Sequence, residues 1–161
     1  MSQTKQVYHF RVTLKTIVDD KRGEQSYREI TILSSHSLST LAQVIVRSFG
    51  FDFDHCYGYY DHLNDPNRAK EIYELFTDLG EDPTPGAFGV TYIKVSKAFD
   101  RVGKKMLFLF DYGDNWQFIV ELIDIKPLEK KAAYPNILKK VGKAPEQYPE
   151  LDEQEEYEEE N

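Results

Sequence analysis

The densest group of chemically versatile side chains lies between Asp111 and Trp116. These six residues, Asp-Tyr-Gly-Asp-Asn-Trp, supply two carboxylates, a phenol, an amide and an indole. Two acids in different environments can share general acid–base work, and carboxylates also bind hard cations. Asp and Asn equally often satisfy the backbone of a turn, which would give Asp114 a structural role and leave Trp116 to fill the core.

A second group of candidate ligands lies about fifty residues before Asp111. It consists of Asp52, Asp54, His55, Cys56, Asp61, His62 and Asp65. No CxxC, HExxH or EF-hand spacing is present, and an unbroken strand would place His55 and His62 on opposite faces. We therefore predict no metal site and no cofactor. Cys56 lies among aromatic residues and is predicted to be a small buried hydrophobic residue.

The elements expected to position Asp111 and Trp116 are two antiparallel strands within residues 104–125, folded back at residues 112–115. Even-numbered apolar residues alternate along both strands: Met106, Phe108 and Phe110, then Trp116, Phe118, Val120 and Leu122. A three-residue connection makes these sets face each other, whereas a two-residue connection opposes even and odd positions. We favour three residues because the aromatic side chains then share one buried face, and we expect Gly113 to supply a positive φ.

Other segments predict an α+β fold, mainly an antiparallel sheet of two hairpins plus a middle strand, with one principal helix packed on it. Residues 8–18 and 26–33 have strand patterns around a polar turn at 19–23. Residues 38–49 carry an apolar stripe of helical period, with Ser37 as N-cap and Gly50 at the C-terminal end. The helix is expected to cover the first hairpin.

The segments around the second hairpin give weaker patterns. A strand is expected near residues 56–60, and Asp65-Pro66 is suited to starting a helix. Residues 68–77 fit either a helix or a short strand around residues 72–76. A single helical turn is expected over 96–99. After Pro127 we expect an extended arm with one helical turn at 137–140.

Charge is concentrated at the C-terminal end of this chain. The net charge is −8 over 161 residues, yet residues 150–161 hold eight acids and no base, which leaves 20 acids and 20 bases elsewhere. We predict a single α+β domain over 1–149 and a disordered acidic tail over 150–161, which aids solubility or docks to a basic partner. A nearly neutral body argues against nucleic-acid binding. One cysteine, no signal sequence and no long apolar run predict a cytoplasmic protein without membrane contact.

Several segments occur in an order that resembles a known family. They are residues 8–14, residues 39–41 leading to 49–52, His55, residues 110–116, Tyr134-Pro135 and residues 142–146. In that order they resemble the pRi-plasmid open-reading-frame-three-like family, and 110–116 is the most specific part. The resemblance implies a compact α+β domain, often encoded near mobile elements and sometimes labelled resolvase-like, with no established reaction. The family's main branch has a His shortly after the Trp, where this chain has Phe118.

These observations favour a non-enzymatic binding or adaptor protein that takes a protein partner. Its candidate binding residues are Asp111, Tyr112, Asp114, Trp116 and His55. The enzymatic alternative is a metal-assisted hydrolase that uses Asp111 and Asp114 with His55, and a third hypothesis is a nucleic-acid accessory protein. No recombinase, P-loop or GxSxG motif is present. The sequence leaves the oligomeric state open.

Overall fold

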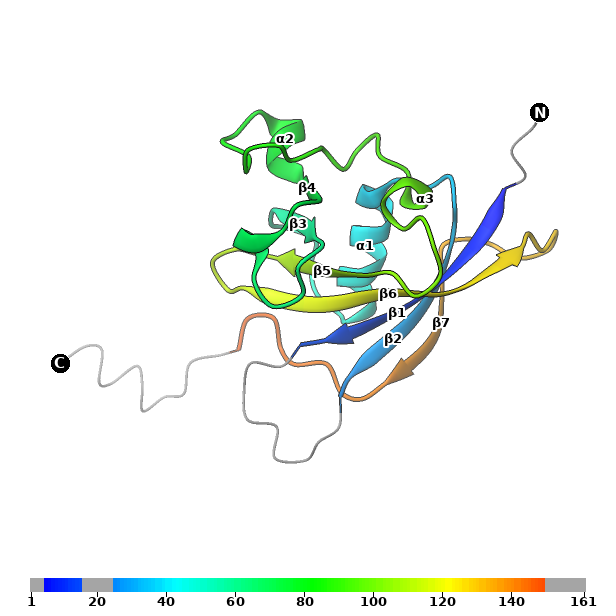
Figure 1. The fold of residues 1–161 in the computed structure, drawn as a ribbon. Coiled ribbons are helices and arrows are strands. Elements are labelled where there is room, and N and C mark those ends of the chain that lie inside the picture. Colours follow the sequence, from blue (N-terminus) through cyan, green and yellow to red (C-terminus); the bar gives the residue numbers. More distant parts are fainter. Residues whose placement is uncertain (1–4, 16–24, 150–161) are drawn as a thin grey trace.

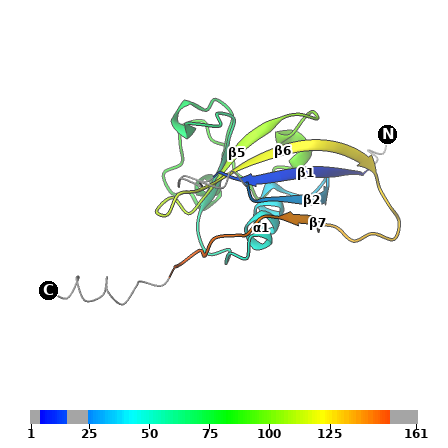
Figure 2. The same cartoon turned by 90° about the horizontal axis from the view of Figure 1, so that it is seen from below.

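An antiparallel sheet forms the frame of the protein, and the computed structural model describes it over residues 5–15 and 25–149. Within these residues the strands are β1 (Gln6–Leu14), β2 (Tyr27–Leu33), β3 (Tyr57–Tyr60), β4 (Ile72–Glu74), β5 (Lys105–Phe110), β6 (Trp116–Pro127) and β7 (Asn136–Val141). Their order across the sheet is β4-β3-β5-β6-β1-β2-β7, and every neighbouring pair is antiparallel. Figure 2 shows β6, β1, β2 and β7 side by side.

The helices lie on one face of this sheet (Figure 1). They are α1 (Leu38–Ser48), α2 (Leu75–Leu79) and α3 (Val95–Ala98), with a 3-10 turn η1 (Pro66–Arg68) in addition. The side chain of Ser37 caps α1 by accepting from the Thr40 N–H at 3.1 Å, and Gly50 has φ +77° after its end. The apolar stripe of α1 is fully buried against the sheet. The α+β class with one principal helix is confirmed.

The second hairpin has the predicted facing of its apolar residues. Phe110 pairs with Trp116 and Phe108 with Phe118, so the even-numbered side chains share the face of the main core. Leu107 and Leu109 are buried in a smaller cluster on the other face. Five residues separate the two strands instead of three, and this keeps the same parity. The prediction for Gly113 is wrong: positive φ angles occur at Asp111 (63°) and Asn115 (59°). Short polar side chains tolerate this left-handed conformation because they can hydrogen-bond the local backbone.

Residues 57–79 combine the two patterns that the sequence left open. β3 lies within the expected middle strand, β4 follows as a short edge strand, and α2 begins directly after it. The side chain of Asp65 caps η1 by accepting from the Asn67 N–H, and Pro66 occupies the first position of η1 as expected. The single turn expected over 96–99 is α3.

The arm after β6 differs from its prediction. Residues 137–140 form no helical turn; they belong to β7, which pairs with β2 and extends the sheet. Its alternating apolar residues are few, so pairing with β2 rather than local pattern determines its conformation. The expected turn at 19–23 and the tail at 150–161 lie outside the described residues. None of the helices within 5–15 and 25–149 is long and apolar enough to cross a membrane.

Candidate functional site

Asp111 directs both its backbone and its side chain into the turn. Its N–H donates to the Cys56 carbonyl at 2.9 Å, and its carbonyl accepts from the Asn115 N–H at 2.5 Å. The carboxylate Oδ1 accepts from the N–H groups of Gly113 (3.1 Å) and Asp114 (3.2 Å). These bonds hold the turn in its left-handed conformation. They leave the second carboxylate oxygen, Oδ2, to contact His55, although the Asp111 side chain is only 9% exposed.

Oδ2 of Asp111 meets His55 in a group that we call the open cluster, namely Asp54, His55, Asp111 and Tyr148. His55 Nε2 lies 3.3 Å from Asp111 Oδ2 and 2.5 Å from Tyr148 Oη. Tyr148 donates its proton to Asp54 Oδ2 at 2.9 Å, so toward His55 it can only accept. His55 Nε2 therefore carries a proton that Tyr148 and Asp111 share. The side chains of Asp54 and His55 are 44% and 40% exposed.

The C-terminal arm brings Tyr148 to this cluster through Gln147. The Gln147 side chain is buried and accepts from the Asp52 N–H at 2.7 Å while donating to the Asp52 carbonyl at 3.1 Å. It also donates to Asp54 Oδ1 at 3.3 Å. One amide side chain thus replaces a backbone pairing between the arm and the segment before β3. The open cluster joins three segments far apart in sequence.

The open cluster has a negative electrostatic field. Loss of hydration, the hydrogen bond to Asp54 and the charges of Asp54, Asp111 and Asp114 together raise the pKa of Tyr148 to about 12. Asp114 is exposed, and no hydrogen bond to its carboxylate is present within the described residues. A field that disfavours a phenolate favours a cation at the same place.

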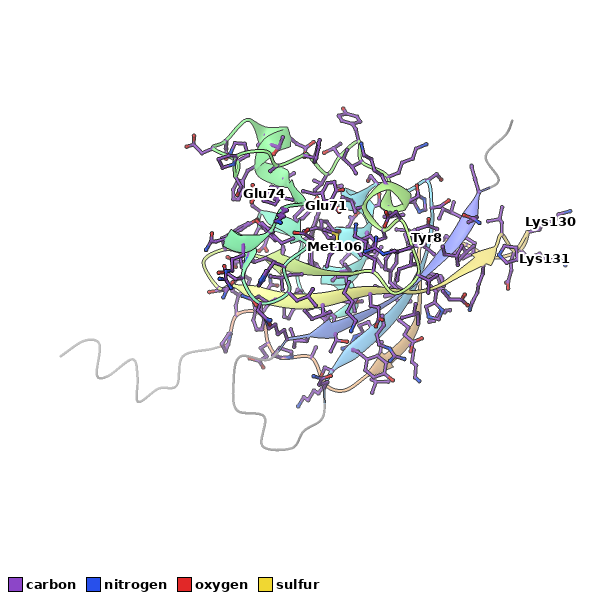
Figure 3. All side chains as sticks on the ribbon, viewed as in Figure 1. Tyr8, Glu71, Glu74, Met106, Lys130 and Lys131 are labelled. Atoms are coloured by element: carbon purple, nitrogen blue, oxygen red, sulfur yellow. The ribbon has the colours of Figure 1, made fainter. Side chains whose placement is uncertain are left out.

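Tyr112 points away from the open cluster into a second group, which we call the closed cluster: Tyr60, Glu74, Thr84 and Tyr112. Tyr60 donates to Glu74 Oε2, so Tyr112 must donate to Tyr60, at 2.7 Å. Glu74 also accepts from the N–H (2.7 Å) and the hydroxyl (2.9 Å) of Thr84. Glu74, labelled in Figure 3, is only 3% exposed. Every acceptor of this carboxyl group faces a protein donor.

The closed cluster is tightly fitted. A Cβ at Gly58 would lie 2.7 Å from Tyr112 Oη and 2.9 Å from Tyr60 Oη, so glycine is needed for the two phenols to meet. The ring of Tyr112 also packs on Phe76 at 4.9 Å between centroids. Burial raises the pKa of both phenols, and the nearby Glu74 raises it further.

Trp116 lies between the hairpin tip and the core. Its ring packs on Phe51 at 4.8 Å, and the residue is half-buried. Its indole N–H is shielded from solvent and has no hydrogen-bond partner in the described part of the chain. Trp116 therefore supports the tip from below and contributes no polar group to the exposed rim.

The candidate ligands of residues 52–65 are dispersed. His62 Nδ1 accepts from the Asp65 N–H, and Asp61 Oδ1 accepts from the Lys70 N–H. Within residues 5–15 and 25–149, no three His, Cys, Asp or Glu side chains are grouped to hold a metal ion. Cys56 is half-buried rather than buried, and burial raises the pKa of its thiol.

Comparison with known proteins identifies the family. A family model described as Plasmid pRiA4b ORF-3-like protein matches residues 6–159. The chain belongs to this family. The fold of this ORF-3-like chain is similar to that of a crystal structure from Methanosarcina mazei Go1, a protein of unknown function, with a TM-score of 0.67 and 20% identity. That match covers 88% of this chain and 72% of the other, and it shows a shared fold. No curated protein matches.

The structure brings together two of the sequence-predicted site residues of this ORF-3-like chain, Asp111 and His55. Asp114 is exposed, and its charge acts on Tyr148 of the same cluster. Tyr112 lies in the closed cluster and Trp116 beneath the turn. Sequence reasoning missed Asp54 as a site residue, and it missed Tyr148 and Gln147 altogether. The family resemblance of residues 142–146 was the signal that could have directed attention to the arm.

Proposed function

We propose that this protein is a non-enzymatic binding module, acting in the cytoplasm, which takes a cationic side chain of a protein partner at the open cluster. The main support for this proposal is that three carboxylates, those of Asp54, Asp111 and Asp114, act together on Tyr148 beside His55. Asp111 Oδ2 contacts His55, and the Asp111 side chain is 9% exposed. Asp114 is exposed, and its carboxylate has no hydrogen-bond partner within the described residues. These oxygens retain capacity to accept hydrogen bonds from a bound lysine or arginine.

The chemistry of the rim supports a cation over other ligands. The charges that raise the pKa of Tyr148 also attract an ammonium or guanidinium group. The exposed ring of Tyr148 offers a face for cation–π contact. Charge-assisted hydrogen bonds contribute about 1.5–3 kcal/mol each, enough for one anchoring side chain to determine partner choice.

The metal-assisted hydrolase needs more than this geometry provides. Asp111 and His55 are in contact, but no triad of metal-ligand side chains is grouped in residues 5–15 and 25–149. Asp54, His55 and Tyr148 of the open cluster are exposed to solvent, and Asp111 is buried beside His55. Recognition requires only that arrangement, whereas metal-assisted hydrolysis also requires a positioned ion and a water.

Site-specific photocrosslinking tests the proposal. A benzophenone amino acid is placed at position 114 in one variant and at position 124 in the other, since Asp124 is also exposed but lies at the far end of β6. We expect position 114 alone to crosslink one protein, which then binds the unmodified chain when both are purified. Equal crosslinking at both positions, or no binding by the purified partner, would contradict the proposal.

A further inference from the structure

The two edges of the sheet are protected differently. The edge strand β4 is covered, because the Glu74 N–H donates to the Phe88 carbonyl at 2.8 Å and the Phe88 N–H donates to the Ile72 carbonyl at 2.9 Å. At the other edge, β7 bonds to β2, and its end bonds to Arg28 through the Val141 carbonyl. Within the described residues its outer side has no backbone partner. An uncovered edge is available to a further extended segment.

The uncovered edge is basic. Residues 126–143 contain six lysines and one acid, a net charge of +5. The lysines are Lys126, Lys130, Lys131, Lys139, Lys140 and Lys143, and all six are exposed. Figure 3 shows Lys130 and Lys131 at the end of the loop that leads from β6 to β7. Lysines on an edge discourage pairing with neutral or basic strands, but they leave the edge open to an acidic one.

The chain itself contains an acidic segment of suitable length. Residues 150–161 hold eight acids and no base. They follow an arm fixed by Ser26 at the Lys143 carbonyl and by Gln147 at Asp52. The segment therefore begins beside the negative open cluster, whose charges repel it.

The distances allow the segment to reach the edge in its own molecule. Lys139 and Lys140 precede Pro149 by ten and nine positions, and an extended chain spans about 3.3 Å per residue, so they lie within roughly 35 Å of Pro149. Twelve residues can extend roughly 40 Å. A tether of this kind gives an effective concentration in the millimolar range, which favours the same molecule over a second copy.

We propose that residues 150–161 dock along the lysine-lined outer edge of β7 in the same molecule. The segment neutralises the edge and blocks strand addition there. Charge complementarity and a free backbone edge carry this assignment, independently of the function proposed for the open cluster. Because exposed charges are screened by salt, the docking is strongest at low ionic strength.

Paramagnetic relaxation in the full chain tests the docking. A nitroxide is attached at Glu160→Cys in a Cys56→Ser background. Amide signals of residues 138–143 should lose about half their intensity or more at ~0.01 M salt, where the Debye length is about 30 Å, and recover at ~1 M. Lys139→Glu with Lys140→Glu should abolish the effect. Lys94→Glu with Lys97→Glu, two exposed lysines on the α3 side, should leave it intact.

Three results would overturn the assignment. The first is absent or uniform broadening. The second is broadening when a nitroxide-labelled chain is mixed with an unlabelled, isotope-enriched chain, which means that a second copy is the occupant. The third is that the unmodified chain binds double-stranded DNA and shows no tail contact, and that Lys139→Glu with Lys140→Glu abolishes the DNA binding. The lysines would then serve a nucleic acid and not the acidic segment.

A second measurement serves if Cys56→Ser does not fold. The full chain with its native cysteine is compared with a variant in which Glu155, Glu156, Glu158 and Glu159 become Gln. Docking predicts amide shift changes concentrated in residues 138–143. Changes elsewhere, or none, would count against it.

Discussion

The open and closed clusters begin at two neighbouring residues of one turn, Asp111 and Tyr112, yet they use polar groups in opposite ways. The closed cluster surrounds a 3% exposed carboxyl group, Glu74, with three donors from two residues. The open cluster exposes the carboxylate of Asp54 beside His55 and Tyr148, and of its members only Asp111 is buried, at 7% exposure. A buried polar network that is fully satisfied stabilises and specifies the fold.

Polar groups stabilise the fold in the closed cluster, whereas in the open cluster they are available for binding. Unsatisfied capacity in the interior costs stability, so Glu74 must be matched by donors of the protein itself. At the surface, water can serve the same oxygens, and a partner can replace that water. Substitutions in the closed cluster should therefore change stability, and substitutions in the open cluster should change binding.

The largest expected effect is that of Glu74→Ala. It leaves the buried Tyr60 hydroxyl and both donors of the exposed Thr84 without their acceptor, and it opens a cavity where the buried Glu74 side chain lay. We expect the free energy of unfolding to fall by about 3 kcal/mol. Urea denaturation measures this change. Asp114→Ala, an exposed acid of the same hairpin region, is the control and should change stability by less than about 0.5 kcal/mol. Similar losses for both variants would remove the distinction between the clusters.

Alkaline pH should weaken the closed cluster next. The pKa values of Tyr60 and Tyr112 are raised above 10 in the folded protein, so above pH 10 the unfolded chain loses protons that the folded chain keeps. The stabilisation from these phenols is therefore complete below pH 10 and falls as pH rises, by about 1.4 kcal/mol per pH unit for the buried Tyr60. Tyr112 is 37% exposed, so solvent screening makes its contribution smaller. Melting curves of Tyr60→Phe with Tyr112→Phe should show a flatter decline. An unchanged slope would mean that these phenols titrate normally.

Two glycine substitutions test the geometry of the turn. Gly58→Ala places a methyl group against both phenols and should destabilise the protein by about 2 kcal/mol. Gly113→Ala should be nearly neutral, because Gly113 lacks a positive φ and its Cβ would lie 3.4 Å from Asp111 Oδ1, an ordinary contact. A loss of about 1 kcal/mol or more at Gly113 would instead favour the left-handed glycine expected from sequence.

A smaller effect is expected at the arm. Gln147→Ala removes the bonds to both backbone groups of Asp52, and we expect a loss of about 1 kcal/mol. Hydrogen exchange should increase at the Asp52 N–H, while the Thr84 N–H in the closed cluster keeps its protection. Unchanged exchange at Asp52 would show that other contacts hold the arm.

The sequence predicted the local parts of this fold well. The facing of Phe110 and Trp116 and the Ser37 cap of α1 follow from alternation and from capping chemistry within a few residues. β7 was missed because its pairing with β2, more than a hundred residues earlier, overrides its weak local pattern. The positive φ angle of the turn was wrongly assigned to Gly113. It occurs at Asp111 and Asn115, because Asp and Asn also adopt positive φ when their side chains bond the backbone.

The site was predicted only in part for the same reason. Asp111 and His55 stood out by residue type and family resemblance. Tyr148 and Gln147 reach the cluster from more than ninety residues away along the chain. Glu74 showed no local signal either, because its donors Tyr60 and Thr84 are brought together by the β3–β4 pairing and the loop after α2.

The most direct test of the binding role is the affinity of the crosslinked partner for Asp111→Asn with Asp114→Asn. Asn can keep the left-handed turn and its backbone bonds while it removes the charge. We expect the double variant to bind at least ~10-fold more weakly, about 1.4 kcal/mol, as measured through fluorescence of Trp116, the chain's single tryptophan. Asp124→Asn with Glu129→Gln, which removes two charges at the far end, should bind normally. Equal affinity of the two double variants would contradict the account.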